Sequence, residues 1–114
     1  LGQAVTIDPV WAGEIPSTKV YEDDRVLVFK DIAPVAPVHL LAIPKVHIQS
    51  VDAIDASNCE LVGYLFTVIA KVAREQGLSD GYRVVSNIGK DGGQSVPHLH
   101  FHILGGKELA WPAL

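Results

Sequence analysis

Three histidines alternate with hydrophobic residues near the carboxyl end of the chain, in the run His98-Leu99-His100-Phe101-His102. Successive side chains of a β-strand point to opposite faces of its sheet, so this spacing predicts a strand over 96–104 with all three imidazoles on one face. Titratable side chains packed this closely cost stability unless they share partners. The pattern therefore indicates a functional site rather than three ordinary core residues.

The segments before this strand predict a hairpin, a central strand and a further strand. Hydrophobic residues flank the polar turn 22–25, which is typical of two antiparallel strands within 20–30. Residues 38–43 are almost continuously apolar apart from His39, as expected of a strand buried on both faces. A further strand is predicted over 82–87.

One long helix is predicted between these strands. Hydrophobic residues recur over 61–72 at the 3.6-residue spacing of an amphipathic helix. Ser57 and Glu60 predict a capping box at its start, and Gly77 is placed to end it. A second, short helix is predicted over 10–12, after an N-capping aspartate and a proline. This order of elements predicts an α+β fold with a mostly antiparallel sheet of about five strands.

Composition narrows the class of protein. The 114 residues are 48% hydrophobic and 19% charged, which suits one compact domain and excludes intrinsic disorder. The formal net charge of -4 argues against binding to long nucleic acids. No apolar run is long enough to span a bilayer and the start lacks a basic signal-peptide region, so we expect a cytoplasmic protein without a membrane partner. The single cysteine, Cys59, excludes an intramolecular disulfide and a thiolate zinc site.

Two kinds of chemistry fit the clustered histidines. A His-x-His pair can supply two ligands to a catalytic zinc ion. Alternatively, a neutral imidazole can attack phosphorus while its neighbours donate hydrogen bonds. The glycine-rich loop over 88–95 favours phosphoryl chemistry, because glycines allow backbone N–H groups to turn toward an anion. On this interpretation no metal and no other cofactor is required.

The same region resembles the signature of the histidine triad family, and within it the Hint branch of nucleoside phosphoramidate hydrolases. The resemblance covers nearly the whole chain and implies a single HIT domain over 1–114. Its most specific parts are Asp91-Gly92-Gly93-Gln94-Ser95-Val96, the alternating histidines and Leu104-Gly105-Gly106. Trp111-Pro112 is similar to the Hint carboxyl terminus, whereas Pro97 is more similar to the Fhit branch of dinucleoside polyphosphate hydrolases.

The resemblance implies a mechanism in which His100 attacks the α-phosphorus of a nucleotide and forms a covalent nucleotidyl-histidine. Water then releases the nucleoside monophosphate. Free imidazole, with a pKa of about 6.5, is mostly neutral and nucleophilic at neutral pH. His98 and His39 are expected to support the site through a polar relay from His39 to His98. The groups expected to donate hydrogen bonds to the phosphoryl oxygens are His102, Asn87, Ser95 and the backbone of Gly93 and Val96.

The remaining expected contacts concern the nucleoside and a partner subunit. Asp31 is expected to accept hydrogen bonds from the ribose hydroxyls, because an ionised carboxylate is an acceptor only. Hydrophobic walls for a purine are expected from Phe29, Ile32, Ile15 and Val10. Such walls discriminate poorly between adenine and guanine, so AMP and GMP conjugates are both expected substrates. By resemblance the protein forms a homodimer, in which Trp111 lines the leaving-group pocket of the partner.

The favoured function is hydrolysis of purine nucleoside 5′-phosphoramidates, such as AMP joined to an amine or to a lysine side chain. Pro97 leaves open a Fhit-type hydrolase of dinucleoside polyphosphates. A nucleotide-binding or scaffold protein with little turnover would keep the same fold and pocket, and a metal site would require stoichiometric zinc or iron. A uridylyltransferase-like role is less favoured, because those proteins carry glutamine where this chain has His102.

Overall fold

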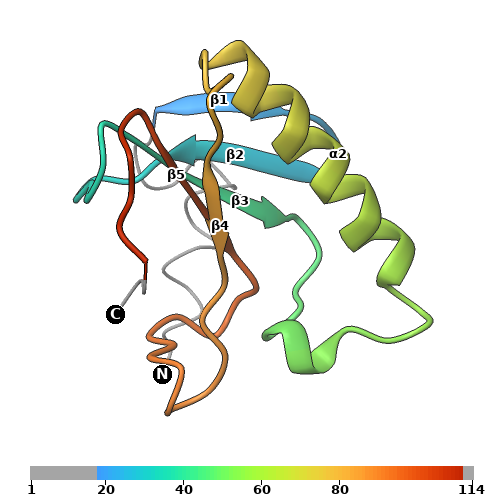
Figure 1. The fold of residues 1–114 in the computed structure, drawn as a ribbon. Coiled ribbons are helices and arrows are strands. Elements are labelled where there is room, and N and C mark those ends of the chain that lie inside the picture. The colour runs from blue at the N-terminus through green and yellow to red at the C-terminus, as the bar shows by residue number, and fades with distance from the viewer. Residues whose placement is uncertain (1–17, 112–114) are drawn as a thin grey trace.

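The computed structural model describes residues 18–111 of the chain, which contain an antiparallel sheet and one long helix (Figure 1). Five strands pair in the order β1-β2-β3-β5-β4, which places β3 at the centre. The elements are β1 (Lys19–Glu22), β2 (Val26–Lys30), β3 (Val38–Pro44), the 3-10 helix η2 (Val51–Ala53), α2 (Cys59–Glu75), β4 (Arg83–Val85) and β5 (Phe101–Gly105). The predicted α+β fold is confirmed, whereas the short helix predicted over 10–12 lies outside the described residues.

The turn between β1 and β2 is closed by Asp23. One carboxylate oxygen of Asp23 accepts hydrogen bonds from the backbone amides of Arg25 and Val26 at 2.8 and 2.9 Å. The other accepts from the hydroxyl of Tyr21 at 2.9 Å and from the hydroxyl of Tyr64 in α2. Burial alone would raise the pKa of Asp23, but these donors hold it well below its usual range. The predicted hairpin is confirmed, and its turn is fastened to the helix.

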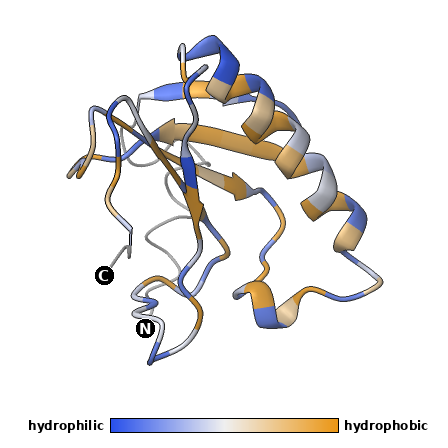
Figure 2. Ribbon diagram, viewed as in Figure 1, coloured by the Kyte–Doolittle hydropathy of each residue, from blue (hydrophilic) through white to orange (hydrophobic). Residues whose placement is uncertain are grey.

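The helix α2 lies across one face of the sheet and buries its hydrophobic stripe there (Figures 1 and 2). The buried helix residues are Val62, Leu65, Val68, Ile69, Val72 and Ala73. They belong to one core cluster with sheet residues Val26, Val28, Leu40, Ala42, Phe101 and Ile103. Side chains alternate along each strand, so the intervening residues of β2, β3 and β5 face the other side of the sheet. A second, smaller cluster of Leu27, Phe29 and Ile43 lies on that side.

The two ends of α2 differ in how well they were predicted. Asn58 is the N-cap residue and makes no side-chain capping bond. Ser57 instead donates its amide and hydroxyl to the carboxylate of Asp55, so the predicted capping box with Glu60 is wrong. At the other end Gly77 has φ of +77°, the left-handed conformation in which helices commonly end. The predicted termination by this glycine is confirmed.

The strand that carries the histidines is shorter than predicted, because β5 begins only at Phe101. Before it, the amide of Leu99 donates to the carbonyl of Ile48 at 2.6 Å and the amide of His98 donates to Val96 at 2.9 Å. These bonds lie outside the strand ladder, so the strand predicted over 96–104 is wrong for its first half.

The edge strand β4 is also shorter than the strand predicted over 82–87. Beyond its end the Ser86 hydroxyl donates to the carbonyl of His100 at 3.0 Å. This side-chain bond takes the place of a continued backbone ladder. Within residues 18–111, no helix combines the length and apolar character needed to cross a membrane.

Candidate active site

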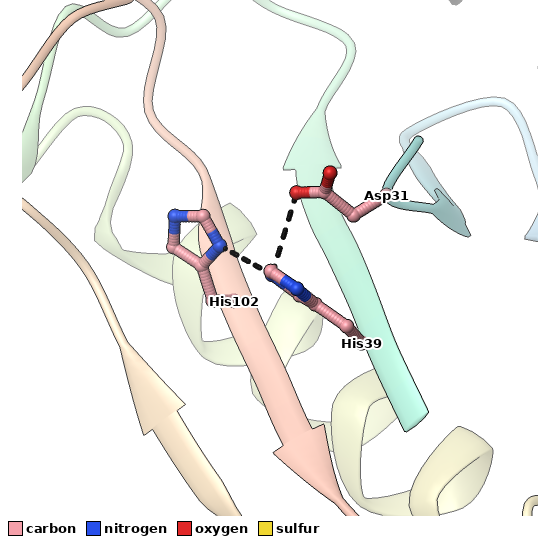
Figure 3. Close-up of side chains that lie close together, drawn as sticks. All are labelled: Asp31, His39 and His102. Atoms are coloured by element: carbon pink, nitrogen blue, oxygen red, sulfur yellow. Dashed lines mark hydrogen bonds and ion pairs between the residues drawn. The ribbon is translucent and has the colours of Figure 1, made fainter. Parts of the chain in front are cut away.

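The pairing of β3 with β5 brings two of the predicted site histidines together. His39 lies opposite Leu104, and His102 lies opposite Leu41, so the two histidines are near neighbours on adjacent strands. Nε2 of His39 is 2.9 Å from Nδ1 of His102, a hydrogen-bonding distance, and the ring centroids are 5.1 Å apart (Figure 3). His39 is buried and His102 is half-buried. The contact between the two histidines therefore depends on the register between β3 and β5 and not on alternation within one strand.

Asp31 extends this pair to three groups. It follows β2, and its backbone amide donates to the carbonyl of His39 at 3.0 Å. One oxygen of its carboxylate lies 3.3 Å from Nε2 of His39, while the other accepts a hydrogen bond from the amide of Ala33 at 2.8 Å. Figure 3 shows the carboxylate and the His102 ring meeting at the same end of the His39 ring. The result is a chain of carboxylate, imidazole and imidazole.

His100 lies beside this chain with its ring held by the backbone. Its ring centroid is 5.3 Å from that of His102, and its Nδ1 is 2.7 Å from the carbonyl oxygen of His98. A carbonyl oxygen can only accept a hydrogen bond, so Nδ1 of His100 carries a proton. In the neutral ring Nε2 then has a lone pair. The backbone contact thus fixes which ring nitrogen of His100 carries the proton and which has the lone pair.

His98 is directed to the opposite end of β3. It is completely buried, its Nε2 is 3.0 Å from the carbonyl oxygen of Pro44, and its ring packs edge-on against His47 at 5.3 Å. The predicted relay from His39 to His98 is wrong, because the side-chain bond of His39 is made with His102. The reason is topological: β3 and β5 are antiparallel, so the residues that precede β5 lie near the end of β3 and far from its start.

The electrostatics of the site favour the uncharged form of His102. Burial lowers the pKa of His102, and the neighbouring rings of His100 and His39 lower it further by charge repulsion. The carboxylate of Asp31 acts in the opposite direction and does not cancel these effects. A neutral imidazole has one N–H donor and one acceptor, so the chemistry of His102 depends on which nitrogen carries its proton.

The glycine-rich loop is held in shape by side-chain amides that the sequence did not single out for this task. Gln94 accepts a hydrogen bond from the amide of Gly89 at 3.0 Å, and donates to the carbonyls of Gln49 and Val96 at 2.8 and 3.0 Å. In the sequence, only the position of Gln94 between a glycine and a serine of the loop could have indicated this role. Sequence reasoning therefore missed Gln94 as the residue that joins the two ends of this loop.

The predicted phosphate donors occupy this same loop. The side chain of Asn87 donates to the carbonyl of Gly92 at 2.8 Å, so it also supports the loop. Gly93 has φ of +79°, a conformation that favours glycine. Gly93 and Ser95 are exposed, and Val96 packs against the smaller core cluster. The amide of Gly93 donates to the carbonyl of Lys90 at 3.1 Å, so this predicted phosphate donor is already used within the loop, and the loop presents the hydroxyl of Ser95 to solvent.

The structure describes only some of the residues predicted to contact the purine, and these differ in burial. Phe29 is buried in the cluster that Val96 joins, on the face of the sheet opposite α2. Ile32 follows Asp31 and is 94% exposed. Val10 and Ile15 lie outside the described residues. Trp111, the residue predicted to reach a partner subunit, is 85% exposed.

The chain of Asp31, His39 and His102 also has the residue types of a metal site. Among residues 18–111, the only group of three close metal-ligating side chains is Asp31, His39 and His102, whose ligand atoms lie within 4.8 Å of one another. Two nitrogen ligands of one tetrahedral zinc ion are about 3.3 Å apart or more. The facing nitrogens of His39 and His102 are 2.9 Å apart, so this arrangement fits a shared proton better than a shared zinc ion.

Known proteins resemble this chain along most of its length. Residues 12–109 match the HIT domain. A protein of Zea mays named 14 kDa zinc-binding protein is 50% identical over 107 residues, which cover 92% of this chain and 84% of the relative. An uncharacterized HIT-like protein of Synechococcus elongatus is 50% identical over 99 residues, 87% of each chain.

Solved structures agree with the fold. A histidine triad protein from Clostridium difficile is 51% identical, with a TM-score of 0.88 and coverage of 92% of both chains. A HIT family hydrolase from Clostridium thermocellum is 43% identical, with a TM-score of 0.91 and coverage of 96% of both chains. The matched segment includes the strands, the helix and all of the histidines described above, and the chain belongs to the HIT domain family.

Proposed function

We propose that this chain hydrolyses purine nucleoside 5′-phosphoramidates through a covalent nucleotidyl intermediate on His100, as the Hint branch of the family does. The observation that carries the proposal is the 2.7 Å bond between Nδ1 of His100 and the carbonyl of His98. This bond leaves the lone pair of the neutral ring on Nε2, which is the atom that attacks. Names given to similar proteins, such as the HIT family hydrolase of Clostridium thermocellum, support hydrolysis as the reaction class.

The reaction proceeds in two displacements. In the first, Nε2 of His100 forms a bond to the α-phosphorus, the P–N bond breaks, and the leaving amine nitrogen takes up a proton from solvent. In the second, the oxygen of water bonds to the same phosphorus, the water releases a proton to solvent and the bond to His100 breaks, which releases the nucleoside monophosphate and restores the imidazole. Hydrogen bonds from His102, Ser95 and the backbone amide of Val96 stabilise the charge on the phosphoryl oxygens.

The nucleoside is assigned to the side of the sheet opposite α2. Asp31 accepts the ribose hydroxyls, and Phe29 with Val96 supplies an apolar surface for the base. The carboxylate of Asp31 is half-buried, so it stays accessible to a ligand while bonded to Ala33. Apolar walls do not distinguish adenine from guanine, so AMP and GMP conjugates are both accepted.

A homodimer completes the leaving-group pocket in this proposal. In the described part of the chain β4 pairs only with β5, which leaves one strand edge open, and Phe66 of α2 is 43% exposed. The segment before Trp111 is tied to β4 by a 2.9 Å hydrogen bond from Arg83 to the carbonyl of Ala110. Gel filtration of the full chain and of a truncation before Trp111 tests this assembly. A monomeric full chain with the specificity of the truncation would contradict it.

Zinc binding is the competing proposal, because the Zea mays relative carries that name and three ligating side chains are close together. The short distance between His39 and His102 argues for a hydrogen bond instead. Elemental analysis of the purified protein separates the two. Stoichiometric zinc together with loss of turnover on chelation would replace the present proposal with a metal mechanism.

The enzymatic test compares turnover of an adenosine phosphoramidate with turnover of diadenosine tri- and tetraphosphate. We expect the phosphoramidate to be preferred, and preference for the polyphosphates would favour a Fhit-type hydrolase. His100→Ala should lose hydrolysis while still binding AMP. If the wild-type protein binds AMP and turns over none of these compounds, it is a nucleotide-binding protein and not a hydrolase.

A further inference from the structure

The hydrogen bonds around His39 determine which of its ring nitrogens carries a proton. The backbone amide of Val35 lies 3.1 Å from Nδ1 of His39 and donates to it. An amide N–H is a donor only, so Nδ1 of His39 has to be an acceptor and the neutral ring carries its proton on Nε2. The carboxylate of Asp31, 3.3 Å from Nε2, favours the same position. Two independent contacts thus select one tautomer of His39.

The tautomer of His39 in turn selects the tautomer of His102. Nε2–H of His39 faces Nδ1 of His102 at 2.9 Å, so Nδ1 of His102 is the acceptor in this bond. Its proton is then on Nε2, which Figure 3 shows at the end of the ring away from His39. Among residues 18–111 no side chain or backbone group hydrogen-bonds to that nitrogen. The donor of His102 is therefore available to a ligand.

His100 and His102 consequently present opposite groups side by side. His100 is held with its proton on Nδ1 and a lone pair on Nε2, by the carbonyl of His98. His102 is held with a lone pair on Nδ1 and its proton on Nε2. The two rings are 5.3 Å apart between centroids. One imidazole offers an electron pair and its neighbour offers a hydrogen bond, which suits attack on a phosphoryl group.

We infer that His39, held by the backbone amide of Val35, is a positioning residue that keeps His102 in the Nε2–H tautomer beside the lone pair of His100. The inference rests on the proposed function for its catalytic consequence, and on geometry alone for the tautomers. The segment 31–37 supplies the amide of Val35 that binds His39, so it influences the chemistry of β5, which is distant in sequence. His39 itself need not touch the substrate.

Two substitutions of His39 separate its contact with the amide of Val35 from its contact with His102. In His39→Asn the shorter amide reaches the height of Nδ1 and can accept from Val35, but it cannot reach His102. In His39→Gln the longer amide places an NH2 group near the former Nε2, where the carboxylate of Asp31 orients it as a donor to His102. The pair is matched in chemistry and differs in which contact it retains.

The direct test is ¹⁵N NMR of the histidine rings of the full-length wild-type protein above neutral pH, with signals assigned by variants. We expect Nε2 to be protonated in His39 and His102, and Nδ1 in His100. In His39→Asn the nitrogen signals of His102 should move toward the average of two tautomers, and in His39→Gln they should stay as in the wild type. An Nδ1–H tautomer of His39 or His102 in the wild type would overturn the inference.

Activity provides the second readout. Loss of the hydrogen-bond partner of a metal-bound histidine costs about tenfold to a hundredfold, and by analogy kcat on an adenosine phosphoramidate should fall by about that factor in His39→Asn. His39→Gln should retain most of kcat, and KM should change little in either variant. Equal losses in both variants would contradict the positioning role. If the wild type does not hydrolyse the substrate but shows the expected tautomers, the proposed function fails and the tautomer assignment stands.

Discussion

Gln94 is bonded to Gly89 and Val96, near the two ends of the glycine-rich loop, and to Gln49 outside it, so replacing this residue should affect both stability and turnover. A neutral hydrogen bond contributes about 1 kcal/mol net, and water replaces part of it at a half-buried position. Gln94→Ala should therefore lower the free energy of unfolding by about 1–2 kcal/mol. In Gln94→Glu an oxygen would replace the nitrogen that now lies 2.8 Å from the carbonyl of Gln49 and 3.0 Å from that of Val96. Although nearly isosteric, Gln94→Glu should be the more destabilised, because it sets three acceptors against one another.

Urea unfolding followed by circular dichroism measures the first effect, and initial rates on an adenosine phosphoramidate measure the second. Loss of loop order should lower kcat by about tenfold or more, because the loop donors act only when they are held in place. Gln49→Ala is the matched control, since only the backbone oxygen of this exposed residue takes part in the contact. A Gln94→Glu variant with the stability and activity of the wild type would refute the assigned role of this loop.

Three further outcomes follow from the structure. In Gly92→Ala the new Cβ would lie 2.8 Å from the backbone nitrogen of Ile88 and nearer still to its carbonyl oxygen, so urea unfolding and kinetics should show loss of both stability and turnover. In Gly63→Ala no atom would lie within 4 Å of the new Cβ, so this variant should instead stabilise α2 by about 0.5–1 kcal/mol. Burial and neighbouring charge lower the pKa of His102, so the unfolded chain binds this proton more readily than the folded one. The stability contributed by the neutral ring is therefore complete above about pH 6.5 and is lost as the pH falls through the lowered pKa. The free energy of unfolding, measured between about pH 7 and pH 5, should decline more steeply in the wild type than in His102→Gln. Dialysis against a chelator should leave kcat unchanged, and recovery of a lost activity by added zinc would contradict the metal-free mechanism.

Local patterns in the sequence were sufficient for the hairpin and the long helix. The 3.6-residue spacing over 61–72 and the glycine at 77 concern neighbours in sequence, and the structure reproduces both. The predicted strand over 96–104 depended on alternation alone, which does not reveal whether a neighbouring strand is present to pair with. Leu99 finds its partner in Ile48, outside the sheet, and the strand therefore starts later than the alternation suggests.

The candidate site likewise contains residues that local sequence patterns predict and contacts that they do not. His100 and His102 were identified from their spacing, but the partner of His39 depends on the register between β3 and β5, which no local pattern specifies. The contact of His39 with the amide of Val35 is made by backbone, so its donor carries no residue-type signal in the sequence. Gln94 is a third example, because its three partners include a carbonyl 45 residues away. Non-local backbone partners were the part of the site that sequence reasoning did not reach.

The nucleophile is the central claim, and trapping the intermediate tests it most directly. The protein is mixed with an adenosine phosphoramidate, quenched during turnover, digested and examined by tandem mass spectrometry, with His102→Ala as a control that keeps the proposed nucleophile. We expect an added nucleoside monophosphate on the peptide that contains 98–102, with fragment ions that place it on His100 and no adduct in His100→Ala. Turnover with an adduct on another residue, or an adduct that persists in His100→Ala, would contradict the account.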